Sequence, residues 1–348
     1  MTEHKVTSPV LDVRDLHIEF DTRHGALKAI DGVSLQIAPG EILGVVGESG
    51  AGKSLTGTAI TGLLESPGRI AGGKIHLEGH RIDTLSQDEM RRLRGRRIGA
   101  IFQDPLTSLN PLYTVGRQLI ETIRTHLPMS KAQARQKAIQ LLSEVGLPAP
   151  ETRIDQYPHQ FSGGMRQRVV IALALCADPK LVIADEPTTA LDVSVQAQII
   201  TVLKRLCREQ GTAVMLVTHD MGVIAEAADR VAVMYAGRLV EVGPVAEVVK
   251  SAKHPYTQGL MNSIPTVLHD VERLEQIEGS MPRLTAIPEG CAFNPRCPHA
   301  FSRCRVERPN LIAVGDSDAA CWLVEDMEEP LLPRSETAKT ATLSDHHV

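Results

Sequence analysis

Residues 42–54 of this 348-residue chain read ILGVVGESGAGKS. The run Ile42–Val46 is short and wholly apolar, which is typical of a buried strand, and a helical pattern follows Ser54. The segment between them, Gly47-x4-Gly52-Lys53-Ser54, matches the P-loop pattern in the strand-to-helix context that supports it. Glycines let successive N–H groups and a helix N-terminus point at one anion, so the segment predicts a phosphate-binding loop.

The predicted loop supplies both a charge and a hydroxyl to a nucleotide. Lys53 fits the cation that reaches the β- and γ-phosphates, and the hydroxyl of Ser54 fits a ligand of Mg²⁺. We expect the phosphates of ATP to be bound by Gly47, Glu48, Ser49, Gly50, Ala51, Gly52, Lys53 and Ser54.

A second apolar run, residues 181–184, ends in the adjacent carboxylates Asp185 and Glu186. Open α/β sheets bind their ligands at the carboxyl ends of strands, so both side chains are expected beside the loop. Phosphoryl transfer needs a metal clamp and a positioned nucleophile. Asp185 fits the carboxylate that supports Mg²⁺, and Glu186 fits the group that polarises the attacking water.

Composition restricts the class of protein. Hydrophobic residues make up 43% of the chain and charged residues 23%, as in an ordinary soluble globular protein. The net charge of −5 gives no global basic excess that would favour nucleic acid as a partner. The longest apolar stretch, residues 169–177, is half of the roughly 18 residues that a membrane-spanning helix needs. The N-terminus has no apolar signal core, so we expect a cytoplasmic location.

The patterning along the chain predicts an α/β core of the P-loop NTPase class. An N-terminal antiparallel β subdomain is expected first, and an Ala-, Gln- and Leu-rich helical insertion over 115–145 interrupts the α/β alternation. The predicted strands cover 11–20, 28–37, 42–46, 98–102, 181–184 and 213–217, with a hairpin of 231–235 and 238–242.

Five further features narrow the class of P-loop protein. Gln103 ends a predicted strand, Ser162-Gly163-Gly164-Met165-Arg166-Gln167 opens a helix, and Ala190-Leu191-Asp192 follows the two carboxylates. His219 ends another strand, and Phe20 precedes the first long loop. In this order the chain resembles the ATP-binding subunits of ABC transporters, with a Q-loop, signature motif, D-loop, switch histidine and adenine-stacking aromatic in turn.

The resemblance implies two chains and a division of roles. Ser162, Gly163, Gly164 and Asp192 of one subunit would close over the P-loop of another, so that ATP holds a head-to-tail dimer together. His219 would orient the γ-phosphate and the water, and Gln103 would reach Mg²⁺ or that water. The signature reads Phe-Ser-Gly-Gly-Met where the family usually has Leu-Ser-Gly-Gly-Gln, so Met165 lacks an amide donor.

The C-terminal quarter carries its own motifs. His254-Pro255-Tyr256-Thr257 and the segment from Gly290 to Cys304 resemble the C-terminal extension of the oligopeptide/dipeptide importer ATPases. The cysteines Cys291, Cys297, Cys304 and Cys321 have intervening spacings of 5, 6 and 16 residues. Four thiolates suit either zinc or an iron–sulfur cluster, and the absence of any metal is a third alternative. The resemblance implies a 4Fe-4S cluster, acting as a structural staple for a segment with little core of its own. Cys176 and Cys207 lie in helical runs and are expected to be core thiols.

On this basis we expect an ABC ATPase domain over residues 8–250, with a helical subdomain at about 104–165. An importer-type extension with a four-cysteine metal site would cover 251–325, and a flexible tail 326–348. The resemblance implies a peripheral subunit on the cytoplasmic face of the cell membrane that powers peptide import. Its partners would be a homologous second ATPase, two transmembrane permeases and an extracytoplasmic solute-binding protein, with no nucleic acid. The open alternatives are another solute such as nickel or glutathione, a redox-regulated ATPase subunit, and a soluble ABC ATPase outside transport.

Overall fold

The structure is a computed structural model that describes residues 8–23, 25–102, 104–188, 192–263 and 277–327. The strands form two sheets, one of four strands in the order β2-β1-β4-β5 and one of eight in the order β11-β12-β10-β9-β3-β8-β7-β6. The four-stranded sheet consists of β1 (Leu11–Thr22), β2 (Gly25–Ile37), β4 (Gly68–Leu77) and β5 (His80–Arg81). The eight-stranded sheet consists of β3 (Ile42–Val46), β6 (Ile98–Ile101), β7 (Leu181–Asp185), β8 (Ala213–Val217), β9 (Arg230–Tyr235), β10 (Arg238–Pro244), β11 (Ile312–Val314) and β12 (Ser317–Ala319).

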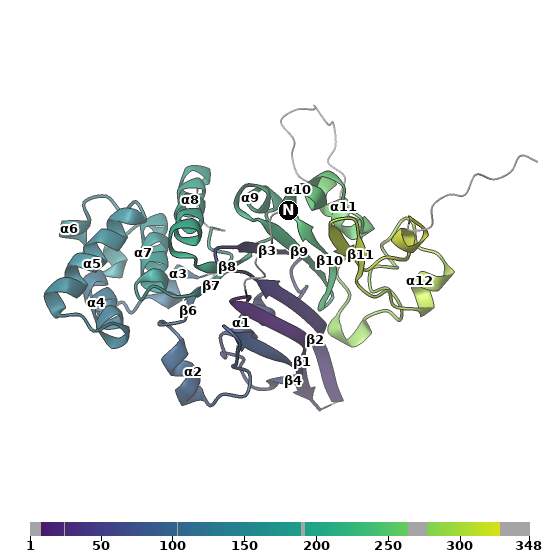
Figure 1. Cartoon of the computed structure of the whole chain (residues 1–348), viewed down its shortest axis with the longest axis horizontal. Helices are drawn as coiled ribbons and strands as arrows, with labels where there is room; N and C mark the ends of the chain where they lie inside the picture. Colours follow the sequence, from purple (N-terminus) through teal and green to yellow (C-terminus); the bar gives the residue numbers. More distant parts are fainter. Residues whose placement is uncertain (1–7, 24, 103, 189–191, 264–276, 328–348) are drawn as a thin grey trace, which may run out of the picture.

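The helices surround the larger sheet, and one group of them stands at its β6 end (Figure 1). The helices that follow β3 and precede this group are α1 (Lys53–Ile60) and α2 (Gln87–Leu93). The group itself comprises α3 (Pro105–Ser108), α4 (Val115–His126), α5 (Lys131–Glu144), α6 (Pro150–Arg153), η1 (Pro158–Gln160) and α7 (Gly163–Leu175). The remaining helices are α8 (Val193–Gln210), α9 (Met221–Ala227), α10 (Val245–Lys250), α11 (Pro255–Asn262), η2 (Leu284–Ala286), α12 (Ser302–Val306) and η3 (Trp322–Met327).

The larger sheet has a hydrophobic core on each face. All five residues of β3 are buried, and because side chains alternate along a strand they divide between the two cores. Ile42 and Val46 pack in the core that contains α4, α5, α7 and α8. Leu43 and Val45 pack in the core shared with the antiparallel sheet. The strand that leads into the P-loop is therefore held from both sides.

The helical insertion predicted over 115–145 is two helices, α4 and α5, which separate around Pro128. Thr114 and Ser130 cap their N-termini, each accepting a hydrogen bond from a backbone N–H of the first turn. The predicted strands and the hairpin of β9 and β10 are present at the expected places. Within the described ranges, no helix combines the length and the apolar character needed to cross a membrane.

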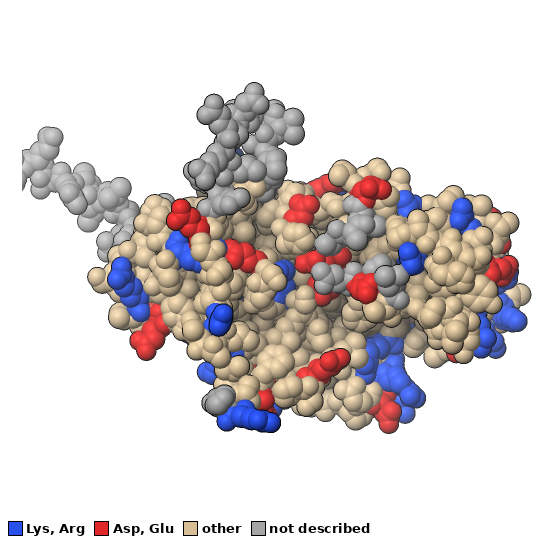
Figure 2. Space-filling model, turned by 180° about the vertical axis from the view of Figure 1, so that it is seen from behind, with Lys and Arg blue, Asp and Glu red and all other residues tan. Residues whose placement is uncertain are grey.

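The last strands depart from the sequence prediction, which anticipated no sheet structure after the hairpin. Strand β12 pairs antiparallel with β10, with Glu241 opposite Ala319, and β11 pairs with β12. The C-terminal region thereby extends the main sheet at the β10 edge. Acidic and basic side chains are mixed across the face drawn in Figure 2, in keeping with the net charge of −5. The part of the expected tail beyond Met327 lies outside the described residues.

Candidate active site

The P-loop connects β3 to α1 with a backbone that requires glycine. Gly47 has a φ of +151°, and a Cβ added there would lie 2.3 Å from the carbonyl oxygen of Met234 in β9. Gly52 has a φ of +104° and directly precedes α1 as its N-cap. Both positions combine a positive φ with close neighbours, so the loop passes tightly against β9 before the helix begins.

Lys53 occupies the inside of this loop. Its side chain is buried, and Nζ donates hydrogen bonds to the carbonyl oxygens of Gly47 (2.8 Å) and Glu48 (3.1 Å). Burial lowers the pKa of Lys53, while the nearby carboxylates of Glu186, Asp185 and Glu48 oppose that shift. The ammonium group is thus enclosed by acceptors that a triphosphate can replace with full negative charges.

Ser54 and Asp185 meet across the site. The Ser54 hydroxyl, in the first turn of α1, donates to Oδ1 of Asp185 at the end of β7 over 2.9 Å. Burial raises the pKa of Asp185, and the Glu186 carboxylate adds to the rise, whereas Ser54 and Lys53 act against it. A hydroxyl and a carboxylate oxygen held side by side are hard donors of the kind that Mg²⁺ binds, so these residues fit the metal that the sequence motif implies.

Glu186 and His219 come from neighbouring strands. β7 and β8 run parallel with Asp185 opposite Val217, so their carboxyl ends coincide. The Glu186 N–H donates to the Val217 carbonyl oxygen (2.8 Å), and Oε1 lies 3.2 Å from Nδ1 of His219. Glu186 also has a φ of +46°, a left-handed conformation that is costly for a residue with a side chain. The predicted water-activating carboxylate and switch histidine are therefore in direct contact.

The signature segment lies at the start of α7. Ser162 caps this helix through a hydrogen bond from the Met165 N–H (3.4 Å), and Ser162 and Gly163 are exposed. The buried amide of Gln167 donates to the carbonyl oxygen of Pro187, next to Glu186, over 2.7 Å. Among the described residues no hydrogen bond or ion pair joins Ser162, Gly163 or Gly164 to the P-loop of the same chain.

The remaining predicted nucleotide contacts are placed only in part. Phe20 is half-buried in β1, and its ring edge lies 3.0 Å from where a Cβ on Gly68 would be. Asp192 is exposed at the N-cap of α8. Gln103, and the preceding D-loop residues Ala190 and Leu191, lie outside the described residues.

The four C-terminal cysteines line one small cavity, together with His254 and Trp322. All four cysteines are free thiols. Burial raises the pKa of Cys321 to about 11, and the three other thiols add to this rise by charge repulsion. Among the described residues, however, no group of three or more His, Cys, Asp or Glu side chains is arranged to hold a metal ion. Cys176 and Cys207 are buried, and burial raises the pKa of each to about 12, which confirms them as core thiols.

Two residues that contact the P-loop were not predicted from the sequence. The Tyr256 hydroxyl accepts a hydrogen bond from the Glu48 N–H of the P-loop, and Arg296 forms an ion pair with the Glu48 carboxylate. Both lie inside the C-terminal motifs that carried the resemblance, yet nothing local in those motifs points to a residue 208 or 248 positions earlier.

Comparison with known proteins agrees with this geometry. The family model for ABC transporters matches residues 30–189, and the model for the oligopeptide/dipeptide transporter C-terminal region matches residues 240–304. The chain is 46% identical over 325 residues to the dipeptide transport ATP-binding protein DppD of Escherichia coli, covering 93% of this chain and 99% of the relative. It is 44% identical over 321 residues to the oligopeptide transport ATP-binding protein AppD of Bacillus subtilis, covering 92% and 98%.

Solved structures show the same cassette. The dimeric ATP-binding cassette MJ0796, in a post-hydrolysis state bound to ADP and Pi, superposes with a TM-score of 0.62 at 29% identity, covering 68% of this chain and 98% of that one. CbiO1 from Clostridium perfringens, part of a cbiONQ transporter complex, gives 0.60 at 28% identity, covering 70% and 91%. The chain belongs to the ABC transporter ATPases, within the group that carries the oligopeptide/dipeptide transporter C-terminal region.

Proposed function

We propose that the protein hydrolyses ATP to power the import of di- and oligopeptides through a membrane ABC transporter. The observation that carries the ATPase half is the convergence of Lys53, Ser54–Asp185 and Glu186–His219 at the carboxyl ends of three adjacent parallel strands. The peptide half is supported by the match over 240–304 and by relatives whose names denote dipeptide and oligopeptide transport.

We propose a role for each side chain that agrees with these contacts. Lys53 exchanges its two carbonyl acceptors for the β- and γ-phosphate oxygens, because charge-assisted hydrogen bonds are the stronger ones. Ser54 and Asp185 would hold Mg²⁺, which neutralises charge on the phosphates when it is bound. Glu186 positions and polarises the attacking water, and His219, which touches Glu186, orients the γ-phosphate and that water. Gln103 is proposed to reach Mg²⁺ or the water, and Phe20 to stack on adenine.

A second ATPase subunit completes the site in this proposal. The exposed helix start at Ser162 and Gly163 can present backbone N–H groups to an anion, while its own chain already has a P-loop. Ser162, Gly163, Gly164 and Asp192 would therefore contact ATP bound to a homologous partner in a head-to-tail dimer. Binding of ATP closes such a dimer and hydrolysis releases it, which is a two-state clamp.

An importer of this class needs transmembrane permeases and an extracytoplasmic solute-binding protein, and we propose that this chain docks on two permeases at the cytoplasmic face of the membrane. Residues 8–250 would form the ATPase domain, with the helical subdomain at about 104–165, and residues 251–325 the extension. The uptake test described below distinguishes peptides from another solute, such as nickel or glutathione.

For the four cysteines we propose a 4Fe-4S cluster that staples the extension. Support comes from four thiols around one cavity, none of them in a disulfide. Four thiolates suit either zinc or an iron–sulfur cluster, and among the described residues no group of three or more His, Cys, Asp or Glu side chains is arranged to hold a metal ion. We prefer the cluster to zinc because the resemblance of this region to the oligopeptide/dipeptide importer ATPases implies it. Iron and acid-labile sulfide in the purified protein would support it, and zinc alone would contradict it.

Peptide uptake tests the proposed function as a whole. Cells that lack this gene are complemented with the wild type or with Glu186→Gln, and uptake of labelled di- and oligopeptides is measured. We expect only the wild type to restore uptake. Two results together would show that the solute is not a peptide: normal peptide uptake in the cells that lack the gene, and co-purification of the protein with permeases from wild-type cells.

A further inference from the structure

Glu48, the second residue of the P-loop, is held at three points. Its N–H donates to the Tyr256 hydroxyl over 2.8 Å, and its carbonyl oxygen accepts from Lys53 Nζ and from the Ala51 N–H, each over 3.1 Å. Its carboxylate accepts from both terminal nitrogens of Arg296, at 2.9 and 3.0 Å. Two of these three anchors come from the C-terminal region, which the sequence places about 200 residues or more away.

Arg296 is itself firmly fixed. Its side chain is only 8% exposed, and it also donates to the carbonyl oxygen of Glu278 (2.8 Å) and to the Tyr235 hydroxyl (3.3 Å). It precedes Cys297, one of the four cysteines that share a cavity. A guanidinium fork held this way fixes the position of the carboxylate it binds, which a flexible ammonium group does not do.

Tyr256 is anchored through its ring. It is fully buried and packs against Tyr235 and Phe293, with ring centroids 4.7 and 5.4 Å apart. Phe293 and Arg296 both belong to residues 291–297, the cysteine loop, which therefore contacts the Tyr256 ring and also carries Arg296. Both anchors of Glu48 thus depend on the same structural unit.

The three anchors respond differently to ATP. When Lys53 turns to the phosphates it releases the Glu48 carbonyl oxygen, which keeps its hydrogen bond from the Ala51 N–H. Tyr256 and Arg296 then hold the N–H and the carboxylate of Glu48 in place. Arg296 also neutralises the Glu48 carboxylate, whose charge acts on Lys53 inside the loop. We propose that Arg296 and Tyr256 are positioning residues that preform the P-loop, so that the cysteine loop of the C-terminal extension sets the affinity for ATP. This inference rests on the proposed ATP binding at the P-loop.

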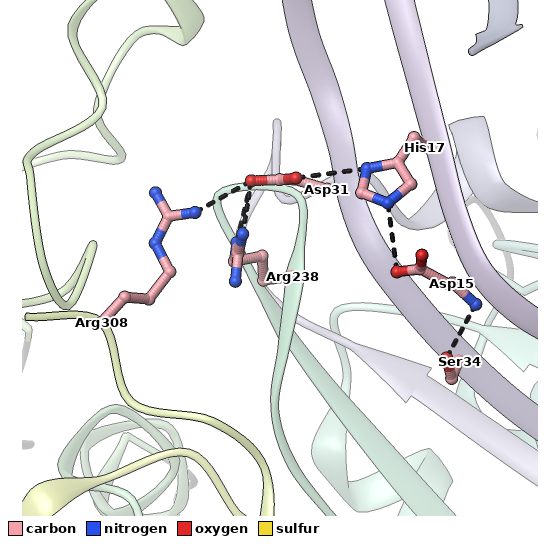
Figure 3. Close-up of polar contacts among 6 residues, drawn as sticks. All are labelled: Asp15, His17, Asp31, Ser34, Arg238 and Arg308. Carbon is pink, nitrogen blue, oxygen red and sulfur yellow. Dashed lines mark hydrogen bonds and ion pairs between the residues drawn. The ribbon is translucent and has the colours of Figure 1, made fainter. Parts of the chain in front are cut away.

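The C-terminal region has a second contact with the core that serves as a control. Asp31 of β2 accepts from Arg308 (2.9 Å) and from Arg238, and its other oxygen lies 3.2 Å from His17, which in turn approaches Asp15 (Figure 3). Arg308 donates hydrogen bonds to the Asp31 carboxylate and to the Gly290 carbonyl oxygen, and neither acceptor lies in the P-loop. Arg308→Gln therefore loosens the same region without touching Glu48.

The test is titration of the purified full-length chain with a fluorescent ATP analogue and Mg²⁺. Arg296→Gln should weaken binding about tenfold, because it breaks a bidentate charge pair and leaves the Glu48 carboxylate without its guanidinium partner. Tyr256→Phe, which keeps the ring, should weaken it about threefold to fivefold by removing one neutral hydrogen bond. Arg308→Gln should bind like the wild type. In the Glu48→Gln background, Arg296→Gln should cost much less, since no carboxylate is left unpaired.

The outcomes separate this inference from the proposed function. Failure of the wild type itself to bind the analogue would contradict nucleotide binding at the P-loop. Tight wild-type binding with unchanged affinity in Arg296→Gln and Tyr256→Phe would overturn the positioning role. An equal loss of affinity in Arg308→Gln would also overturn it, because general loosening of the C-terminal region would then explain the effect. In the assembled transporter, the variants should raise KM for ATP with kcat nearly unchanged, whereas a fall in kcat alone would contradict preforming of the loop.

Discussion

Replacing Gly47 with alanine tests the backbone geometry on which the nucleotide site depends. An added Cβ would lie 2.3 Å from the Met234 carbonyl oxygen, at a residue whose φ is +151°. Gly50 provides a matched control in the same loop, because it has a φ of +84° and its added Cβ would meet no heavy atom within 4 Å. Both variants force a side-chain-bearing residue into a glycine conformation, but only Gly47→Ala drives the loop against a backbone atom of β9.

The expected magnitudes follow from these two costs. The unfavourable conformation costs about 1–3 kcal/mol in either variant, and forcing extra volume against fixed neighbours adds about 1–3 kcal/mol for Gly47→Ala alone. Urea unfolding of the nucleotide-free chain, followed by the fluorescence of its single tryptophan, Trp322, and by circular dichroism, gives both values. The loss of unfolding free energy should be larger for Gly47→Ala than for Gly50→Ala. Equal losses would refute the close packing of the P-loop against β9.

Three further changes probe the site and the extension. Glu186→Gln should keep ATP binding and slow hydrolysis by about 10²–10⁴-fold, the range that a positioned general base contributes; unchanged steady-state turnover would remove that role. Because burial raises the pKa of Asp185, the folded protein binds this proton more tightly than the unfolded chain, and stability falls as the pH rises from 3.8 through the folded-state value. Asp185→Asn should therefore raise the melting temperature of the nucleotide-free protein at neutral pH while Mg²⁺-dependent ATP binding is lost, and a lower melting temperature would contradict this sign. Cys297→Ser should lose iron in elemental analysis and weaken ATP binding as Arg296→Gln does, and full iron content would contradict the assignment of this ligand.

The P-loop could be predicted from the sequence because its signals are local. An apolar strand, glycines at fixed offsets and a helix with Lys53 and Ser54 at its start fall within thirteen consecutive residues, 42–54. Predicting the contact between Glu186 and His219 required one further inference, that two parallel strands end at the same edge of a sheet. The order of motifs supplied that step, and the pairing of β7 with β8 provides the contact.

The attachment of the C-terminal region could not be predicted. Strands β11 and β12 have only three residues each, too few for a hydrophobic pattern in the sequence to mark them, and β12 joins the main sheet by pairing with the edge of β10. The Glu48–Arg296 pair is likewise invisible in sequence, since an arginine beside a cysteine and a glutamate in a glycine loop are each unremarkable alone. Such contacts are fixed by tertiary packing, over a separation of 248 residues.

The most direct test of the account is peptide accumulation in proteoliposomes that contain the complete transporter and its solute-binding protein. Labelled peptide is offered with the binding protein on one side and ATP with Mg²⁺ on the side of the ATPase subunits, and hydrolysis is recorded together with uptake. The account predicts that peptide accumulates with the wild type only when ATP is present, and that Glu186→Gln abolishes both uptake and hydrolysis above background. Accumulation without ATP, or undiminished in the Glu186→Gln complex, would contradict the claim that this chain's ATP hydrolysis drives peptide import.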